Sequence, residues 1–133
     1  MQYLKQKKGF LGYEAFSKKE NKAVVVPFGL EKSVSYGGGT KNGPKEIIKA
    51  SHQLELFDED LNKEPYKSIG IKTLKPITIK NNLEAAINQL ASINEYLITQ
   101  KKFPLVLGGE HSITPGAVKP FAARNKRLTL IHF

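Results

Sequence analysis

The alternation of apolar and polar blocks along the chain predicts short strands separated by helices. Residues 22–29, Lys-Ala-Val-Val-Val-Pro-Phe-Gly, form a β-branched run closed by proline and glycine, which is typical of a buried strand. Further short apolar runs, each bounded by polar residues or glycine, predict three more strands at 68–74, 105–107 and 128–133.

The longest helical pattern runs from Leu83 to Gln100 and follows a helix cap at Asn81 or Asn82. Its apolar residues recur at the spacing of one helix face. They are Ala86, Ile87, Leu90, Ile93 and Leu97. This stripe predicts a helix that packs one side against a core.

Two shorter helices are predicted at 44–51 and 115–125, each opened by a proline, although Pro120 lies inside the second. Residues 52–68 show no periodicity and predict irregular structure. Strands that alternate with helices of these lengths predict βαβ units. The fold class is therefore α/β, with helices on both faces of a parallel sheet.

Composition narrows the class of protein. The chain has 133 residues, 40% hydrophobic and 25% charged, which fits one globular domain at most. It contains no cysteine, so disulfides and thiolate metal ligands are excluded. No apolar run approaches the roughly 18–20 residues of a membrane span, and no secretory signal is recognisable. We therefore expect a cytoplasmic protein with no membrane partner.

The charge balance is basic, with 21 lysines and arginines against 12 aspartates and glutamates and a formal net charge of +9. Such a balance is common in proteins that bind nucleic acid or acidic membranes. Here the basic residues are scattered in pairs, without interleaved aromatic residues or a nucleic-acid motif. A lysine-rich solvated surface explains them better, and we expect no nucleic-acid partner.

The most informative segment for chemistry is 105–112, Leu-Val-Leu-Gly-Gly-Glu-His-Ser, a predicted strand followed by a glycine turn and an acid–histidine pair. Ligands of α/β proteins bind at such strand exits. His111 offers an imidazole, a common ligand of divalent metals. Glu110 is suited to orient that ring or another group, and Ser112 to add a hydrogen bond. On spacing alone, however, a structural or incidental histidine is the better interpretation, and a metal ligand is the alternative.

Other features have simpler interpretations. The glycine-rich loop 36–44 lacks the spacing of phosphate-binding loops and is better explained as a shaped, mobile loop at the rim of a cleft. His132 lies in the last predicted strand and is expected to pack in the core, whereas His52 is expected on the surface. The acidic run 58–60 is typical of a solvated face.

Several segments resemble the ureohydrolases, the arginase/agmatinase family. Residues 107–114, Leu-Gly-Gly-Glu-His-Ser-Ile-Thr, are similar to the first metal motif of that family. Residues 34–47 and the following 50–58 resemble the loop and helix near the start of bacterial agmatinases. The last predicted strand, 128–133, is similar to the strand that leads into the family's Asp-Ala-His-x-Asp motif.

The resemblance implies a partial ureohydrolase domain at 23–133, preceded by an N-terminal extension at 1–22. It implies the first part of a three-layer α/β/α sandwich on a parallel sheet. Members of the family hold two Mn²⁺ ions at the carboxyl ends of strands, where a bridging water attacks the guanidinium carbon and urea leaves. The resemblance further implies a small guanidino substrate such as agmatine, which yields putrescine, and a homo-oligomer for the full-length protein.

By this resemblance His111 is the first metal-ligand histidine, with Glu110 and Ser112 as its supporting residues. The family's other ligands and proton-transferring residues would follow Phe133, and one imidazole cannot hold two Mn²⁺ ions. We therefore expect the N-terminal portion of a Mn²⁺-dependent hydrolase, above all an agmatinase, that is inactive alone. The alternative is a non-catalytic remnant that acts as a binding or assembly module.

Overall fold

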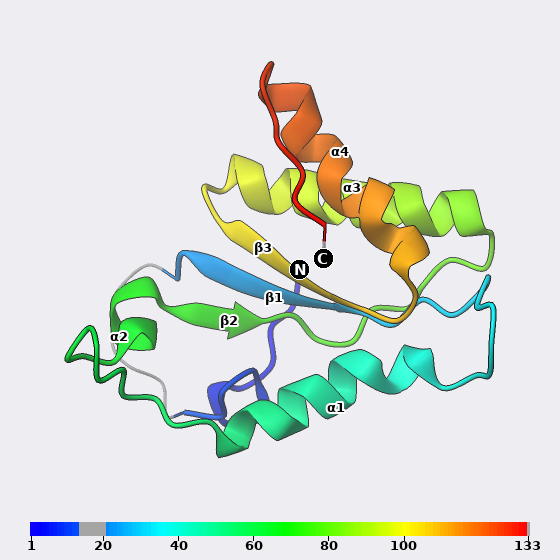
Figure 1. The fold of residues 1–133 in the computed structure, drawn as a ribbon. Coiled ribbons are helices and arrows are strands. Elements are labelled where there is room, and N and C mark those ends of the chain that lie inside the picture. The colour runs from blue at the N-terminus through cyan, green and yellow to red at the C-terminus, as the bar shows by residue number, and fades with distance from the viewer. Residues whose placement is uncertain (14–20, 133) are drawn as a thin grey trace.

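A computed structural model describes residues 1–13 and 21–132, and a parallel sheet lies at its centre (Figure 1). Strand β1 (Ala23–Phe28) pairs with β2 (Ile71–Thr73) and β3 (Phe103–Gly108), so the strand order is β2-β1-β3. The register with β3 extends along the whole of β1 and ends with Phe28 opposite Gly108. The carboxyl ends of β1 and β3 therefore meet at one edge of the sheet.

Strand β1 is central because its side chains are apolar on both faces. Four of its residues are at most 1% exposed: Val24, Val25, Val26 and Phe28. Continuous apolar runs of this kind are expected in parallel strands that are covered on both sides. The strands predicted from the sequence at 22–29, 68–74 and 105–107 are confirmed, with β2 shorter and β3 longer than predicted.

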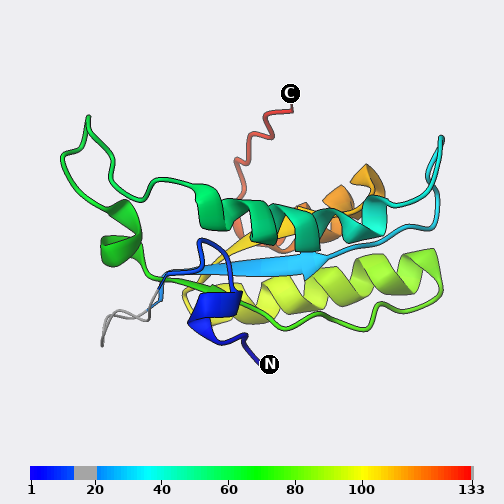
Figure 2. The same cartoon turned by 90° about the horizontal axis from the view of Figure 1, so that it is seen from below.

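Helices cover both faces of the sheet, which gives three layers (Figures 1 and 2). Helix α1 (Gly43–Ala50) lies on one face, and α3 (Leu83–Thr99) and α4 (Thr114–Arg124) lie on the other. The predicted fold class, an α/β/α arrangement on a parallel sheet, is confirmed. No helix in the part of the chain that the structure describes is long and apolar enough to cross a membrane.

Helix α3 supplies most of the core on its side of the sheet. Asn82 caps it, because the Asn82 Oδ1 accepts a hydrogen bond from the N–H of Ala85 at 2.9 Å. Three residues of the predicted stripe are fully buried in the same core as Val24, Val26 and Phe28 of β1: Ala86, Leu90 and Leu97. The predicted helix is confirmed, and burial of this face holds it on the sheet.

Helix α4 packs on α3 so closely that only glycine fits at the contact. A Cβ at Gly116 would lie 2.6 Å from the carbonyl oxygen of Ile87. The buried amide of Asn94 on α3 donates to the carbonyl oxygen of Ala117 at 3.3 Å. The helix predicted at 115–125 is confirmed and continues through Pro120, which removes one helical hydrogen bond.

The segment predicted as irregular at 52–68 contains a short helix, α2 (Pro65–Ile69), which the sequence analysis missed. Pro65 begins this helix, at a position where no N–H is needed. The next residue, Tyr66, is only 6% exposed, and its ring centroid lies 4.4 Å from that of Tyr13. A tertiary aromatic contact, invisible in local periodicity, therefore stabilises α2.

The prediction of a strand at 128–133 is wrong for residues 128–132, which pair with no strand in the described chain. Phe133 lies outside the described residues. Its apolar side chains are 44%, 63% and 72% exposed at Leu128, Leu130 and Ile131. An added strand is stabilised by burial of its side chains. The edge strand β3 likewise leaves Phe103 61% and Leu105 40% exposed, so its own side chains are not covered at these positions.

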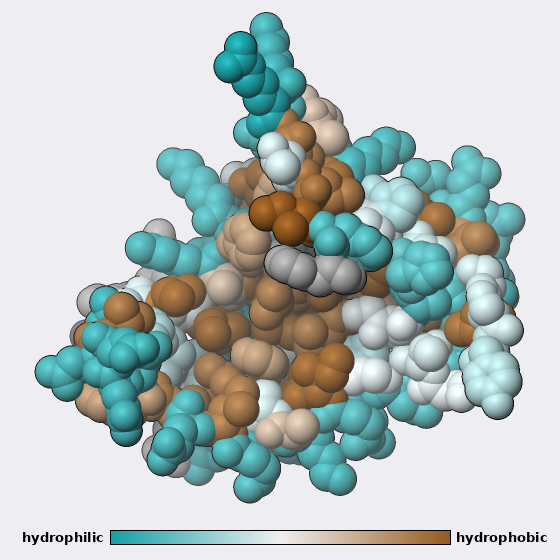
Figure 3. All heavy atoms as spheres, in the orientation of Figure 1, coloured by the Kyte–Doolittle hydropathy of each residue, from teal (hydrophilic) through white to brown (hydrophobic). Residues whose placement is uncertain are grey.

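These exposed side chains contribute to an apolar surface. Figure 3 shows apolar residues gathered in the middle of the face that it presents, over the sheet. Phe103 and Leu105 of β3 are among the large hydrophobic residues that stay exposed. A contiguous apolar area of this kind on a protein surface is typical of a contact surface.

Candidate metal-ligand segment at the exits of strands β1 and β3

The segments that follow β1 and β3 lie side by side because glycine lets their backbones approach each other. The N–H of Glu110 donates to the carbonyl oxygen of Leu30 at 3.0 Å. A Cβ at Gly109 would lie 2.1 Å from that same oxygen. A Cβ at Gly29 would lie 2.2 Å from the carbonyl oxygen of Lys41. The glycine turn expected after β3 is therefore required by close packing.

The carboxylate of Glu110 joins these two segments. It is 8% exposed and accepts hydrogen bonds at both oxygens. Its Oε2 accepts from the N–H groups of Lys32 and Ser33, each at 2.8 Å. Its Oε1 accepts from the hydroxyls of Ser33 at 2.8 Å and Ser112 at 2.6 Å. We call this arrangement the Glu110 clamp.

The clamp holds Glu110 in its ionised form. Burial by itself would raise the pKa of the carboxyl group, because it removes water from the charged form. The hydrogen bonds from Ser112, Ser33 and Lys32 outweigh that effect and lower the pKa to about 2. At neutral pH Glu110 therefore acts as an acceptor and does not donate a proton.

His111 stands beside the clamp, at the start of the short 3-10 helix His111–Ile113 that leads into α4. The residue is exposed, and its carbonyl oxygen accepts from the hydroxyl of Thr114 at 2.8 Å. Among the described residues, no hydrogen bond links the Glu110 carboxylate to the His111 ring; the carboxylate instead holds the backbone at 32–33 and Ser112. The structure thus brings Glu110, His111 and Ser112 together. The Glu110 carboxylate holds the backbone of the neighbouring segment in place and does not bind the imidazole.

A second carboxylate, Glu31, orders the glycine-rich loop and was missed in the sequence. Its Oε2 accepts from the N–H of Gly39 at 2.6 Å, the hydroxyl of Thr40 at 3.0 Å and the N–H of Lys41 at 3.1 Å. The pKa of Glu31 is lowered, chiefly by the Lys41 N–H. The sequence offered only one indication of this role, an acidic residue that lies 8–10 positions before the Gly-Thr-Lys sequence. The loop is shaped, as predicted, and this carboxylate shapes it.

The remaining candidates lie elsewhere. His132 is exposed, so the expectation of a core histidine is wrong, because the strand that would bury it does not form. His52 is exposed as predicted, and its Nε2 lies 2.8 Å from the carbonyl oxygen of Gly9. Glu59 and Asp60 of the acidic run are exposed, as predicted for a solvated face.

The described residues do not by themselves fit a binuclear metal centre. Within residues 1–13 and 21–132, no three or more histidines, cysteines, aspartates or glutamates gather where they could hold an ion. Both oxygens of Glu110 are already engaged by N–H and O–H donors. Of the three residues singled out in the sequence, His111 alone keeps a side-chain nitrogen that is not engaged in a hydrogen bond with a described residue, whereas Mn²⁺ requires several oxygen and nitrogen donors.

Comparison with known proteins gives a consistent result. Residues 21–133 match the model described as the arginase family. The chain is 35% identical over 118 residues to the N(1)-aminopropylagmatine ureohydrolase of Synechocystis sp., covering 84% of this chain and 39% of that protein. It is 32% identical over 117 residues to the agmatinase of Bacillus cereus, covering 85% of this chain and 39% of that one.

Solved structures agree with the sequence matches. The agmatine ureohydrolase of Thermoplasma volcanium has a TM-score of 0.66 and 33% identity, with 76% of this chain and 34% of that chain covered. The arginase of Bacillus subtilis has a TM-score of 0.54 and 30% identity, with 77% and 34% covered. The chain spans 39% of the length of the curated relatives described above. Because the family match extends over residues 21–133 and the fold agrees, the chain belongs to the arginase family.

Proposed function

We propose that this chain is part of a Mn²⁺-dependent guanidino-compound hydrolase of the agmatinase type, which converts agmatine and water to putrescine and urea. The observation that carries the proposal is the Gly108–Ser112 segment at the exit of β3, which presents an exposed imidazole beside a buried, fully bonded carboxylate. The names of the relatives, agmatinase and N(1)-aminopropylagmatine ureohydrolase, support a substrate of the agmatine class.

In this proposal His111 is a metal ligand, and Glu110 and Ser112 are positioning residues. A neutral imidazole is a suitable nitrogen ligand for Mn²⁺. The Glu110 clamp fixes the backbone on both sides of His111 and so limits where its ring can lie. Because the pKa of Glu110 is about 2, its carboxylate is ionised at neutral pH and the clamp stays formed there.

The chain alone is proposed to be inactive, because the exit of β3 offers one imidazole and the described residues gather no group of ligands. Further ligands would have to come from polypeptide outside residues 1–133. In a complete enzyme, 23–133 would form the first part of the domain and 1–22 an extension, in a cytoplasmic homo-oligomer. The same incomplete donor set favours a second candidate function, a non-catalytic binding or assembly module.

The test compares the 133-residue chain with the product of the complete reading frame that contains it. We expect Mn²⁺-dependent urea release from agmatine by the complete product and none by the chain alone. In the complete product His111→Asn should abolish urea release and weaken Mn²⁺ binding measured by calorimetry. The control His52→Gln should leave both unchanged, because His52 contacts the distant Gly9.

Two results would count against these proposals. Urea release by the 133-residue chain would contradict its inactivity. A complete product that neither binds Mn²⁺ nor releases urea would contradict the hydrolase and favour the assembly module.

A further inference from the structure

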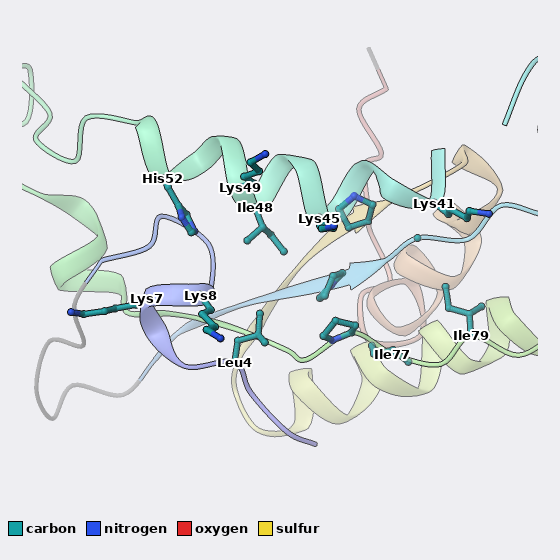
Figure 4. A pocket seen from close by; sticks show the side chains of 14 residues that line it. Leu4, Lys7, Lys8, Lys41, Lys45, Ile48, Lys49, His52, Ile77 and Ile79 are labelled. Atoms are coloured by element: carbon teal, nitrogen blue, oxygen red, sulfur yellow. The ribbon is translucent and has the colours of Figure 1, made fainter. Parts of the chain in front are cut away.

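A groove of about 490 Å³ lies beside α1, opposite the segment that follows β2 (Figure 4). Its floor is apolar and brings together side chains that are distant in the sequence. They include Leu4, Pro27, Ile48, Ile77 and Ile79. A groove of this size is large enough to accept one or two apolar side chains.

The rim of this groove is cationic. Four of the lysines that line it are Lys8, Lys41, Lys45 and Lys49, and no acidic residue of the described chain lines it. Lys45 and Lys49 lie one turn apart on α1, where both are exposed. Neither ammonium group makes an ion pair with a described residue. The fold thus gathers lysines that are scattered in the sequence, and an acidic partner with apolar side chains would complement them.

Residues 54–61, Leu-Glu-Leu-Phe-Asp-Glu-Asp-Leu, have this opposite character, and we call them the acidic turn. Four of these eight residues are acidic. Their apolar neighbours Leu54, Phe57 and Leu61 are 57%, 52% and 55% exposed, which is unusual for such large side chains. Figure 1 shows the segment projecting from the body of the molecule beside α2.

The acidic turn is ordered before it meets any partner. Asp58 and Lys63 exchange backbone hydrogen bonds of 2.8 and 3.2 Å, and the Asp58 Oδ1 accepts from the N–H of Leu61 at 2.8 Å. At its tip, the side chains of Glu59 and Asp60 are exposed and bind no described residue. A turn that is already ordered loses little conformational entropy when it docks.

We propose that the acidic turn of one copy of this protein docks into the lysine-rimmed groove of a second copy. Charge complementarity carries the proposal: Glu59 and Asp60 face the ammonium groups of α1, while apolar side chains of the turn enter the floor. Within one chain the turn does not occupy its own groove, since none of its residues lines that groove.

Because the two surfaces differ, the contact is heterologous and joins copies head to tail, into a ring where the rotation closes. The proposal goes beyond the hydrolase function and does not depend on it. It uses the face of the molecule beside α1, not the exit of β3 where His111 lies.

The experiment reverses each charged surface separately in the product of the complete reading frame. One variant carries Lys45→Glu and Lys49→Glu, and the other carries Glu59→Lys and Asp60→Lys. Asp58 is left unchanged because it accepts the Leu61 N–H. Each variant should weaken self-association about tenfold or more in sedimentation velocity, because like charges then face each other. Exposed sites of this kind should leave the melting temperature near that of the wild type.

Mixing the two variants is the decisive step. The groove of the first variant is now acidic and complements the turn of the second variant, which is now basic. The turn of the first variant and the groove of the second keep their natural, complementary charges. Head-to-tail association between the two variants should therefore return in the mixture. Carbodiimide cross-linking of isotopically labelled and unlabelled wild-type copies should join Glu59 or Asp60 of one copy to Lys45 or Lys49 of another.

The matched control carries Lys119→Glu and Lys126→Glu, exposed positions outside both surfaces, and should associate like the wild type. A wild-type protein that stays monomeric overturns the proposal. So does a mixture that fails to associate, or an oligomer that both variants leave unchanged. An oligomer that both variants leave unchanged would indicate that the groove binds a different anionic amphiphile.

Discussion

Glu110 accepts hydrogen bonds from both the backbone N–H and the hydroxyl of Ser33, each at 2.8 Å, across 77 positions of sequence. These bonds give the segment after β1 a fixed place beside the segment after β3. Backbone N–H groups outside helices and strands have no partner within a regular element, and here a side chain provides it. Because the acceptor is an ionised carboxylate, the bonds are charge-assisted and stronger than bonds between neutral groups.

Replacing Glu110 by Gln should loosen this link while keeping the shape of the side chain. The amide NH₂ of Gln cannot accept, so donors at Ser33, Lys32 or Ser112 lose their partner. We expect the free energy of unfolding to fall by about 1–3 kcal/mol, against about 0.5–1.5 kcal/mol for Ser112→Ala, which removes one hydrogen bond. Urea denaturation measures both. Hydrogen exchange at the Lys32 and Ser33 amides should accelerate in Glu110→Gln, and unchanged protection there would contradict the clamp.

The same carboxylate predicts how stability depends on pH. Its pKa is about 2 in the folded protein, below the ordinary value of 4.5, so folding favours the ionised form. The stabilisation is fully present above about pH 4.5 and is lost as the pH falls towards 2. It corresponds to about 3 kcal/mol. The difference in unfolding free energy between wild type and Glu110→Gln should shrink over that window; a difference that stays constant would show that another group is responsible.

The cap of α3 gives a test with a neighbouring control. The sequence left Asn81 and Asn82 as alternatives, and the structure shows that the Asn82 Oδ1 accepts the Ala85 N–H at 2.9 Å. Asn82→Ala should therefore lower the free energy of unfolding by about 1 kcal/mol. Asn81→Ala should change it by less than about 0.5 kcal/mol. Equal losses in thermal unfolding would mean that the two residues share the cap.

The elements that the sequence predicted well are those with a strong local signal. The valines of β1 form a continuous apolar run typical of a buried strand, and the apolar residues of α3 recur at helix spacing. Both groups contribute to the core. Glycine at 109 was predicted for a tight turn, and the close approach to Leu30 confirms why it is needed. His111 could be singled out because an imidazole directly after a strand exit is chemically conspicuous.

What the sequence could not reveal depends on contacts between distant residues. The apolar alternation at 128–132 resembles a strand, yet a strand forms only where a covered face can bury it. Glu110 and Glu31 each accept hydrogen bonds from two backbone N–H groups, which carry no sequence signature. Lysines such as Lys8 and Lys49 are far apart in the chain, and folding alone brings them to one groove.

Glycine 109 provides the most direct test of how the two strand exits fit together. A Cβ there would lie 2.1 Å from the carbonyl oxygen of Leu30, which is backbone and cannot turn aside. Gly109→Ala must therefore push the exits of β1 and β3 apart and strain the Glu110 clamp. Overpacking of this kind lowers the free energy of unfolding by about 1–3 kcal/mol or more.

Gly38→Ala is the matched control, since its Cβ would meet only the Glu31 Oε1 at 3.5 Å, an ordinary contact. Its backbone needs no left-handed conformation, so the substitution should be neutral or slightly stabilising. Denaturant unfolding compares the two, and hydrogen exchange at the Glu110 amide, which donates to Leu30, reports the separation of the exits. If Gly109→Ala matched the control in both measurements, the close backbone approach would not be what fixes His111 beside the clamp.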